Sequence, residues 1–153
     1  MSEPVGFDAF CDTGSVDDPA RLRVAFPCQH QGCRRAAAVV EVTRRGQLYI
    51  DADQDIIYRV FPNAQGAIRI TGFLPYTNFS TRILNLAATI GAVHAMDPAA
   101  LHALDQTWVP FYCQQCDRSF CSEHWDLKPT FSWGFEHYSG TCPIGHPHFI
   151  DHC

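Results

Sequence analysis

Alternation of apolar and polar positions predicts several strands in the first half of the chain. Residues 67–73 alternate as a half-buried strand does. Residues 36–43 are rich in small and β-branched side chains, and the turn at Arg45-Gly46 predicts a hairpin with 47–51 as the returning strand. The apolar run 56–61 also predicts a strand. These segments indicate a small antiparallel sheet.

One longer segment has the helical period. Apolar residues recur on one face across 80–96, and Ser80 or Thr81 can cap the start of this helix. Asp97 followed by Pro98 predicts the start of a short second helix, because aspartate caps a helix and proline suits its first position. The sequence therefore predicts one main helix with a short helix behind it.

Both ends of the chain lack a clear period. Residues 1–24 are punctuated by glycine, proline and aspartate and predict an irregular lead-in. Cys11, within it, has no partner nearby and is expected to be a buried or free thiol and not a ligand. Residues 108–153 are aromatic and predict a loop-rich region. Its aromatic side chains either pack around metal sites or form an exposed docking patch, for which Trp125 and Trp133 are the candidates.

Composition narrows the class of protein. The chain has 153 residues, 46% of them hydrophobic, which is enough for one folded domain. No apolar run is long enough to span a membrane. The start of the chain lacks the basic and apolar regions of a secretory signal, so a cytoplasmic protein is expected. The net charge of −5 makes nucleic acid an unlikely partner.

Cysteine and histidine form close pairs whose spacing favours metal binding. Cys113-Gln-Gln-Cys116 places two thiols on one tight turn, from which both can reach a single tetrahedral ion. Disulfides are disfavoured in the reducing cytoplasm. Four such pairs would close two structural zinc sites. The candidate zinc ligands are Cys28, Cys33, Cys113, Cys116, Cys121, His124, Cys142 and His146.

Two pairings of these ligands are open. Neighbouring pairs could share an ion, or alternate pairs could share one in a cross-brace. Only residues 117–120 separate the second pair from the third, which is a short linker for folding both onto one ion, so the cross-brace is favoured. It places Cys28, Cys33, Cys121 and His124 on the first ion and Cys113, Cys116, Cys142 and His146 on the second. His148, His152 or Cys153 remain alternatives to Cys142 or His146.

The stretch from Pro110 to His124, with the upstream pair Cys28-x4-Cys33, resembles an AN1-type zinc finger. It shares the family's Cys-x2-Cys-x4-Cys-x2-His pattern and the aromatic Phe120 before the third cysteine. The spacer 34–112 is far longer than the family's, and the family's closing ligands are absent in register. The same pattern is similar to RING-like, cross-braced treble-clef fingers.

The resemblance implies a zinc-stabilised protein-interaction module that works as an adaptor or E3-like factor in a ubiquitin-like conjugation pathway. Its partner would be a ubiquitin-like protein or an E2 enzyme. A factor of this kind needs no catalytic residue of its own.

Two other functions remain open from the residues. A zinc-dependent hydrolase with an open metal site near Glu136 is the first, since the tail has more metal-binding side chains than two closed sites require. A nucleic-acid-binding zinc protein is the second. It would need the arginines to gather on one face; these are Arg21, Arg23, Arg34, Arg35, Arg44 and Arg45.

The predicted fold is α+β, a small antiparallel sheet with one main helix plus a loop-rich two-zinc finger. We expect a single zinc-binding domain over 1–153. Within it, 25–51 form a zinc knuckle and hairpin, 52–107 the inserted strands and helices, and 108–153 the Cys/His-rich finger.

Overall fold

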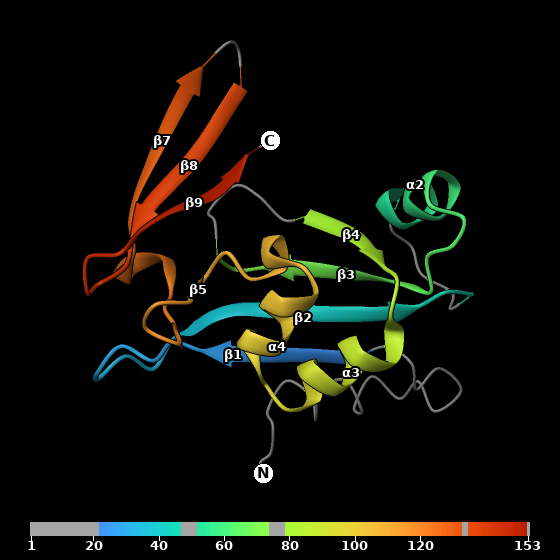
Figure 1. The fold of residues 1–153 in the computed structure, drawn as a ribbon, viewed down its shortest axis with the longest axis horizontal. Helices are drawn as coiled ribbons and strands as arrows, with labels where there is room; N and C mark the ends of the chain where they lie inside the picture. Colours follow the sequence, from blue (N-terminus) through green and yellow to red (C-terminus); the bar gives the residue numbers. More distant parts are fainter. Residues whose placement is uncertain (1–21, 47–51, 74–78, 133–134, 153) are drawn as a thin grey trace.

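The computed structural model describes residues 22–46, 52–73, 79–132 and 135–152. The first half of the chain forms a four-stranded antiparallel sheet in the order β1-β2-β3-β4 (Figure 1). Its strands are β1 (Leu22–Pro27), β2 (Ala36–Arg44), β3 (Gly66–Thr71) and β4 (Phe79–Ile83). Strand β3 is the alternating segment predicted at 67–73, and β2 is the segment predicted at 36–43.

Strand β1 begins inside the segment expected to be irregular. Leu22, Val24 and Phe26 are all buried and alternate with more exposed residues. This period-2 pattern is present in the sequence, so the prediction for residues 22–24 was wrong. The rest of the lead-in, including Cys11, lies outside the described residues.

Strand β2 lies in the middle of the sheet. It pairs with β1 on one side, where Val24 faces Val40, and with β3 on the other, where Ile68 faces Val42. The expected return strand at 47–51 lies outside the described residues. Among the described strands, β1 lies on one edge of β2 and β3 on the other.

The run 56–61 is not a strand but belongs mostly to helix α2 (Ala52–Val60). Only Ile57 of its aliphatic residues is buried, whereas Ile56 and Val60 are 52% and 60% exposed. The β-branched composition favoured a strand. Both neighbouring positions of β3, the next strand along the chain, are filled by β2 and β4, and the segment folds as a helix beside β4 (Figure 1).

The segment 80–96 divides into a strand and a helix. Its first residues complete β4, and helix α3 (Leu86–His94) begins later, capped by Asn85 instead of Ser80 or Thr81. The Asn85 side chain accepts a hydrogen bond from the Ala88 amide at 3.1 Å. Ile83 is fully buried in the sheet. Its position also fits the helical period, and for this reason the predicted helix began too early.

The short second helix, α4 (Pro98–Leu104), is confirmed with its cap. The Asp97 carboxylate accepts a hydrogen bond from the Ala100 amide at 3.1 Å. Leu101 is fully buried. A 3₁₀ turn, η1 (Gln106–Trp108), follows, and α3 and α4 lie across one face of the four-stranded sheet (Figure 1).

The last third of the chain has more regular structure than expected. A short hairpin, β5 (Tyr112–Cys113) and β6 (Arg118–Ser119), leads to the 3₁₀ turn η2 (Ser122–His124). A second antiparallel sheet follows in the order β7-β8-β9, with β7 (Asp126–Ser132), β8 (Phe135–Thr141) and β9 (Pro147–His152). Pro129 lies in β7, an edge strand, where proline is tolerated. That proline weakens the strand signal in the sequence.

An aromatic cluster joins the large sheet to the C-terminal part. Phe111 lies 5.7 Å from Phe26 and 6.2 Å from Phe73, measured between ring centroids. Trp125 contacts Phe73 and Phe120 edge-on at 6.4 Å in each case. One contiguous core therefore runs from the sheet to the base of β7–β9.

The α+β class is confirmed. In the described part of the chain, no helix has the length and apolarity to cross a membrane.

Candidate metal centres

The first ligand pair lies in the loop that joins β1 to β2. The Cys28 amide donates to the Arg35 carbonyl at 2.9 Å, and the Cys33 amide donates to the His30 carbonyl at 3.0 Å. Gly32 has φ of 81°, a conformation that costs glycine little. These hydrogen bonds fold the loop so that both thiols are on the same side of it.

The third pair lies at the 3₁₀ turn η2. Cys121 immediately precedes the turn and His124 ends it, with the His124 amide donating to the Cys121 carbonyl at 2.9 Å. Residues three apart in a 3₁₀ turn eclipse one another, so both side chains lie on one side. The spacing Cys-x2-His therefore places both ligands on the same side of this turn.

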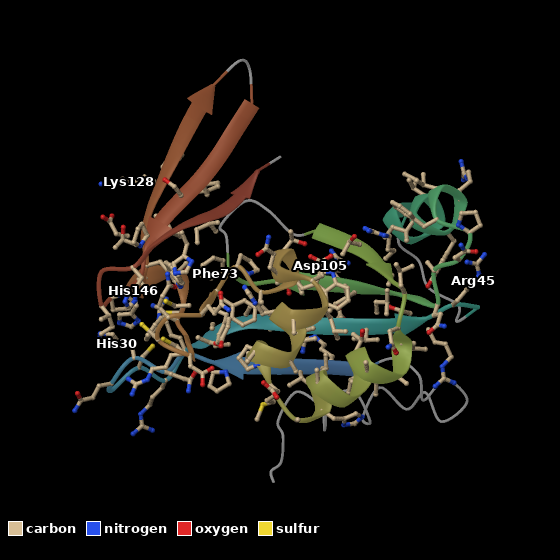
Figure 2. All side chains as sticks on the ribbon, viewed as in Figure 1. His30, Arg45, Phe73, Asp105, Lys128 and His146 are labelled. Carbon is tan, nitrogen blue, oxygen red and sulfur yellow. The ribbon has the colours of Figure 1, made fainter. Side chains whose placement is uncertain are left out.

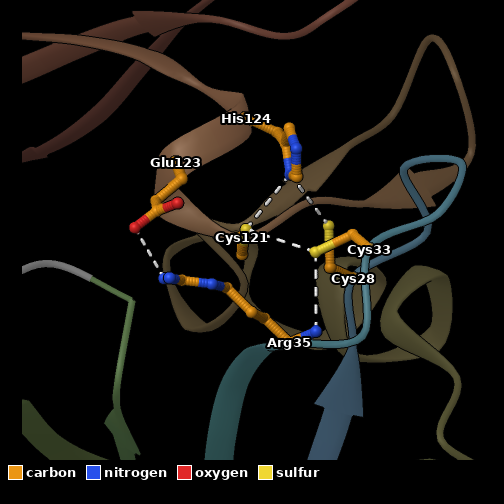
Figure 3. A network of polar contacts seen from close by, with 6 residues as sticks. All are labelled: Cys28, Cys33, Arg35, Cys121, Glu123 and His124. Carbon is orange, nitrogen blue, oxygen red and sulfur yellow. Dashed lines mark hydrogen bonds and ion pairs between the residues drawn. The ribbon is translucent and has the colours of Figure 1, made fainter.

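The first and third pairs meet in one group, which we call cluster 1 (Figure 3). It contains Cys28, Cys33, Cys121 and His124. The Cys33 and Cys121 sulfurs are 3.9 Å apart. The His124 Nδ1 atom lies 3.5 Å from the Cys28 sulfur and 3.2 Å from the Cys121 sulfur.

The second and fourth pairs both lie in hairpin loops. Cys113 ends β5, and Cys116 lies in the turn before β6, where Asp117 adopts a positive φ of 55°. Cys142 and His146 close the loop between β8 and β9, where the Cys142 amide donates to the His146 carbonyl at 3.0 Å.

These two loops form the second group, cluster 2, which contains Cys113, Cys116, Cys142 and His146. The Cys116 and Cys142 sulfurs are 3.7 Å apart. His146 Nδ1 lies 3.6, 3.2 and 3.3 Å from the sulfurs of Cys113, Cys116 and Cys142. The yellow sulfur atoms gather near His30 and His146 at one end of the molecule in Figure 2.

The donor spacing in both clusters fits a tetrahedral ion. Zinc–sulfur bonds of ~2.3 Å at tetrahedral angles place two sulfurs ~3.8 Å apart, and a sulfur and a nitrogen ~3.6 Å apart. The sulfur pairs at 3.9 and 3.7 Å match the first value. Sulfur–nitrogen distances from 3.2 to 3.6 Å lie at or slightly below the second. In each cluster all four donor atoms lie within 4.8 Å of one another. Both groups could therefore hold a metal ion.

Electrostatics within the clusters favour a bound cation. Burial, more than the hydrogen bonds around it, raises the pKa of Cys28 to about 11. Burial and the neighbouring thiols of Cys113 and Cys142 raise the pKa of Cys116 to about 12. Crowded thiols thus keep protons near neutral pH unless positive charge is supplied, and metal binding would release those protons.

Backbone amides instead lower the pKa of two other thiols. Burial alone would raise the pKa of Cys142, but the backbone amides of His146 and Ile144 and the neighbouring side chains outweigh it and lower the pKa to about 6. The Arg35 amide, 3.5 Å from the Cys33 sulfur, is the main cause that lowers the pKa of Cys33. Each cluster therefore contains a cysteine whose pKa is lowered by its surroundings.

The structure brings the eight candidate ligands together in the two groups of the cross-brace, not those of the sequential pairing. His148 remains close to cluster 2, with Nε2 3.2 Å from the Cys113 sulfur, but it is not among the four grouped residues. The side chains of His152 and Cys153 lie outside the described set.

Residues around cluster 1 that were not predicted to be ligands also position it. Gln29 forms two hydrogen bonds with the backbone of Ser119, at 2.7 Å each, and these join the first loop to β6. His30 stacks on His124 with ring centroids 3.9 Å apart. The Arg35 guanidinium pairs with Glu123 at 2.6 Å (Figure 3). Each of these lies within two residues of a ligand, which is the only signal the sequence offers.

This arrangement gives little support to the two alternative functions, a zinc hydrolase and a nucleic-acid-binding protein. Glu136 lies on β8 six residues before Cys142, which corresponds to ~20 Å along a strand. Arg35 immediately precedes β2 and Arg44 ends it, so these two arginines lie at opposite ends of the strand. Figure 2 shows Arg45 at the end of the molecule opposite His30. Trp125 is only 4% exposed, so it packs beside the clusters and is not a docking residue. The Trp133 side chain lies outside the described set.

The chain belongs to a family of proteins that share a domain of unknown function (DUF8328), whose family model matches residues 19–152. That range includes all eight candidate ligands. No curated protein and no solved structure gives a significant match. The family description assigns no chemistry, so the functional argument rests on the two clusters.

Proposed function

We propose that this chain is a zinc-stabilised protein-interaction module with two structural zinc ions, one in each cluster. The observation that carries the proposal is that each cluster offers four protein donors at tetrahedral spacing. Structural zinc is closed by four protein ligands, whereas catalytic zinc keeps one position for water. Two ions closed in this way hold loops in place and leave no coordination position for substrate.

Metal analysis of the protein, purified without added metal, tests this proposal. We expect two zinc ions per chain by elemental analysis and by native mass spectrometry. Cobalt substitution should give the intense visible bands of tetrahedral thiolate sites at both positions. One ion per chain, or a spectrum of five-coordinate cobalt, would contradict two closed sites and favour an open, catalytic metal.

We propose that a protein partner binds the surface at cluster 2. Ile144 is 67% exposed, the highest value among the large hydrophobic side chains that the structure describes, and it lies in the loop between Cys142 and His146. A metal-fixed loop presents such a side chain in one conformation, which lowers the entropic cost of binding. The resemblance of 110–124 to AN1-type and RING-like fingers favours a ubiquitin-like protein or an E2 enzyme as the partner.

The partner proposal has a matched pair of variants. We expect Ile144→Ser to abolish capture of E2 enzymes or ubiquitin-like proteins from a purified panel while both zinc ions are retained. Val60→Ser is the control, because Val60 is 60% exposed on α2, away from the clusters. Equal loss of capture in both variants, or no capture by the parent protein, would contradict a role for this loop in that pathway.

A further inference from the structure

We propose that His148 is a positioning residue for cluster 2, which donates a hydrogen bond from Nε2 to the Cys113 thiolate and does not bind the ion itself. The inference rests on the proposed metal sites. Its basis is the distance of 3.2 Å between His148 Nε2 and the Cys113 sulfur. Cys113 already belongs to a complete set of four donors.

The fold holds the His148 ring at this place. His148 lies on β9 opposite Gly140 of β8. A Cβ atom on Gly140 would lie 3.0 Å from Leu127, 3.2 Å from Ile150 and 3.4 Å from Trp125, so the space at this position is already filled by its neighbours. The Trp125 ring meets the His148 ring edge-on at 5.3 Å, and Trp125 is itself anchored by hydrogen bonds to backbone carbonyls.

The direction of the hydrogen bond follows from metal chemistry. A metal-bound cysteine is a thiolate, which has no proton and can only accept. His148 Nε2 must therefore carry the proton in the metal-bound state. The second contact of the thiol, 3.6 Å to the Gln115 side-chain oxygen, requires a proton on the sulfur and is lost on metal binding.

The other ligand thiols with a comparable donor use the backbone. The Cys33 sulfur lies 3.5 Å from the Arg35 amide, and the Cys142 sulfur lies 3.3 Å from the His146 amide. Cys113 is fully buried, so water cannot take this place. The His148 ring thus donates to Cys113 the hydrogen bond that backbone amides donate to Cys33 and Cys142. Hydrogen-bond donors outside the ligand set stabilise metal ligands in this way.

Metal-release kinetics test the inference in the intact chain, with cluster 1 as an internal control. His148→Phe keeps a ring of similar size and removes the donor, whereas His148→Gln keeps an N–H donor. Zinc transfer to a chromogenic chelator should be about 10–100-fold faster for one of the two ions in the phenylalanine variant. The other ion should leave at the parent rate, and the glutamine variant should fall between the two proteins.

Spectroscopy separates a hydrogen bond from direct ligation and from packing. In the cadmium-substituted protein, the phenylalanine variant should shift one cadmium resonance, and its cobalt form should keep tetrahedral bands at both sites. Loss of those bands at one site would mean that His148 is a ligand and would overturn the inference. Equal kinetics for the phenylalanine and glutamine variants, or release unchanged in both, would overturn it too. Fewer than two ions in the parent protein would instead refute the proposed metal sites.

Discussion

The two clusters have the same donors but join different parts of the molecule. Each has three thiols and one imidazole Nδ1, with two buried and two partly buried ligands. Cluster 1 joins the β1–β2 loop to the turn η2. Cluster 2 joins two small hairpin loops, those of β5–β6 and β8–β9. Identical chemistry therefore serves one large sheet and one small sheet.

The difference predicts how much each part depends on its ion. Strands β1 and β2 continue through a broad core that includes Phe26, Val40 and Ile68, all at most 1% exposed. Among its described side chains, the small sheet contributes few buried ones to that core, including Tyr138 and Ile150. Because small units with little core need metals or disulfides, the β7–β9 sheet should depend more strongly on its ion than the large sheet does.

Breaking cluster 2 should have the largest effect. We expect Cys116→Ser to lower the metal content from two ions to one and to unfold the β7–β9 sheet, because the free energy of zinc binding, about 10–16 kcal/mol in small fingers, is folding free energy. Amide hydrogen exchange would show lost protection in β7–β9 and retained protection in β1–β3. Cys11→Ser, which removes a thiol that is not one of the eight candidate ligands, should change neither quantity.

Breaking cluster 1 at the equivalent position should have a smaller effect. Cys33→Ser should also leave one ion, yet the large sheet should persist, with a loss of about 2–3 kcal/mol in the free energy of unfolding. Circular dichroism melts of the two serine variants, taken side by side, measure the contrast. Equal losses in the two variants would contradict the view that the large sheet supports its own loop.

Glycine substitutions compare the two ligand loops without touching a ligand. Gly145 in the cluster 2 loop has φ of 110°, Gly32 in the cluster 1 loop has φ of 81°, and a Cβ atom on either would meet nothing within 4 Å. Alanine at each should cost about 1–2 kcal/mol from backbone strain alone. Gly91→Ala, in the exposed middle of α3, should instead stabilise by about 0.5–1 kcal/mol. Chemical denaturation of the three variants tests the sign and the order.

The grouping of the ligands could be predicted because it is encoded locally. Pairs with two to four residues between them can share a turn, and the short linker 117–120 favours closing the second and third pairs on different ions. The same local logic predicted β2, β3 and the Asp97-Pro98 helix start. These features depend on residues close in sequence, where spacing and side-chain type carry the information.

Features that depend on distant contacts were not predictable in this way. The position of Ile83 fits the apolar period of both a strand and a helix. Its pairing with Gly66 of β3 places it in a strand. The run 56–61 has strand-like composition, but most of it forms a helix that packs beside β4. Strands β7 to β9 owe their order to pairing and to the loop at Cys142–His146, and the contact of His148 with Cys113 joins residues 35 positions apart.

The smallest effect should come from the ion pair beside cluster 1. Arg35 and Glu123 approach to 2.6 Å, but their side chains are 61% and 59% exposed. Water and salt screen such pairs, so Glu123→Gln should cost about 0.5 kcal/mol or less, and the cost should vanish at high ionic strength. Both ions should remain bound, since the pair lies outside the donor set. A loss of zinc from cluster 1 in this variant would show that the loop and η2 need the ion pair to hold the ligands together, and that cluster 1 depends on its surroundings more than the comparison with cluster 2 implies.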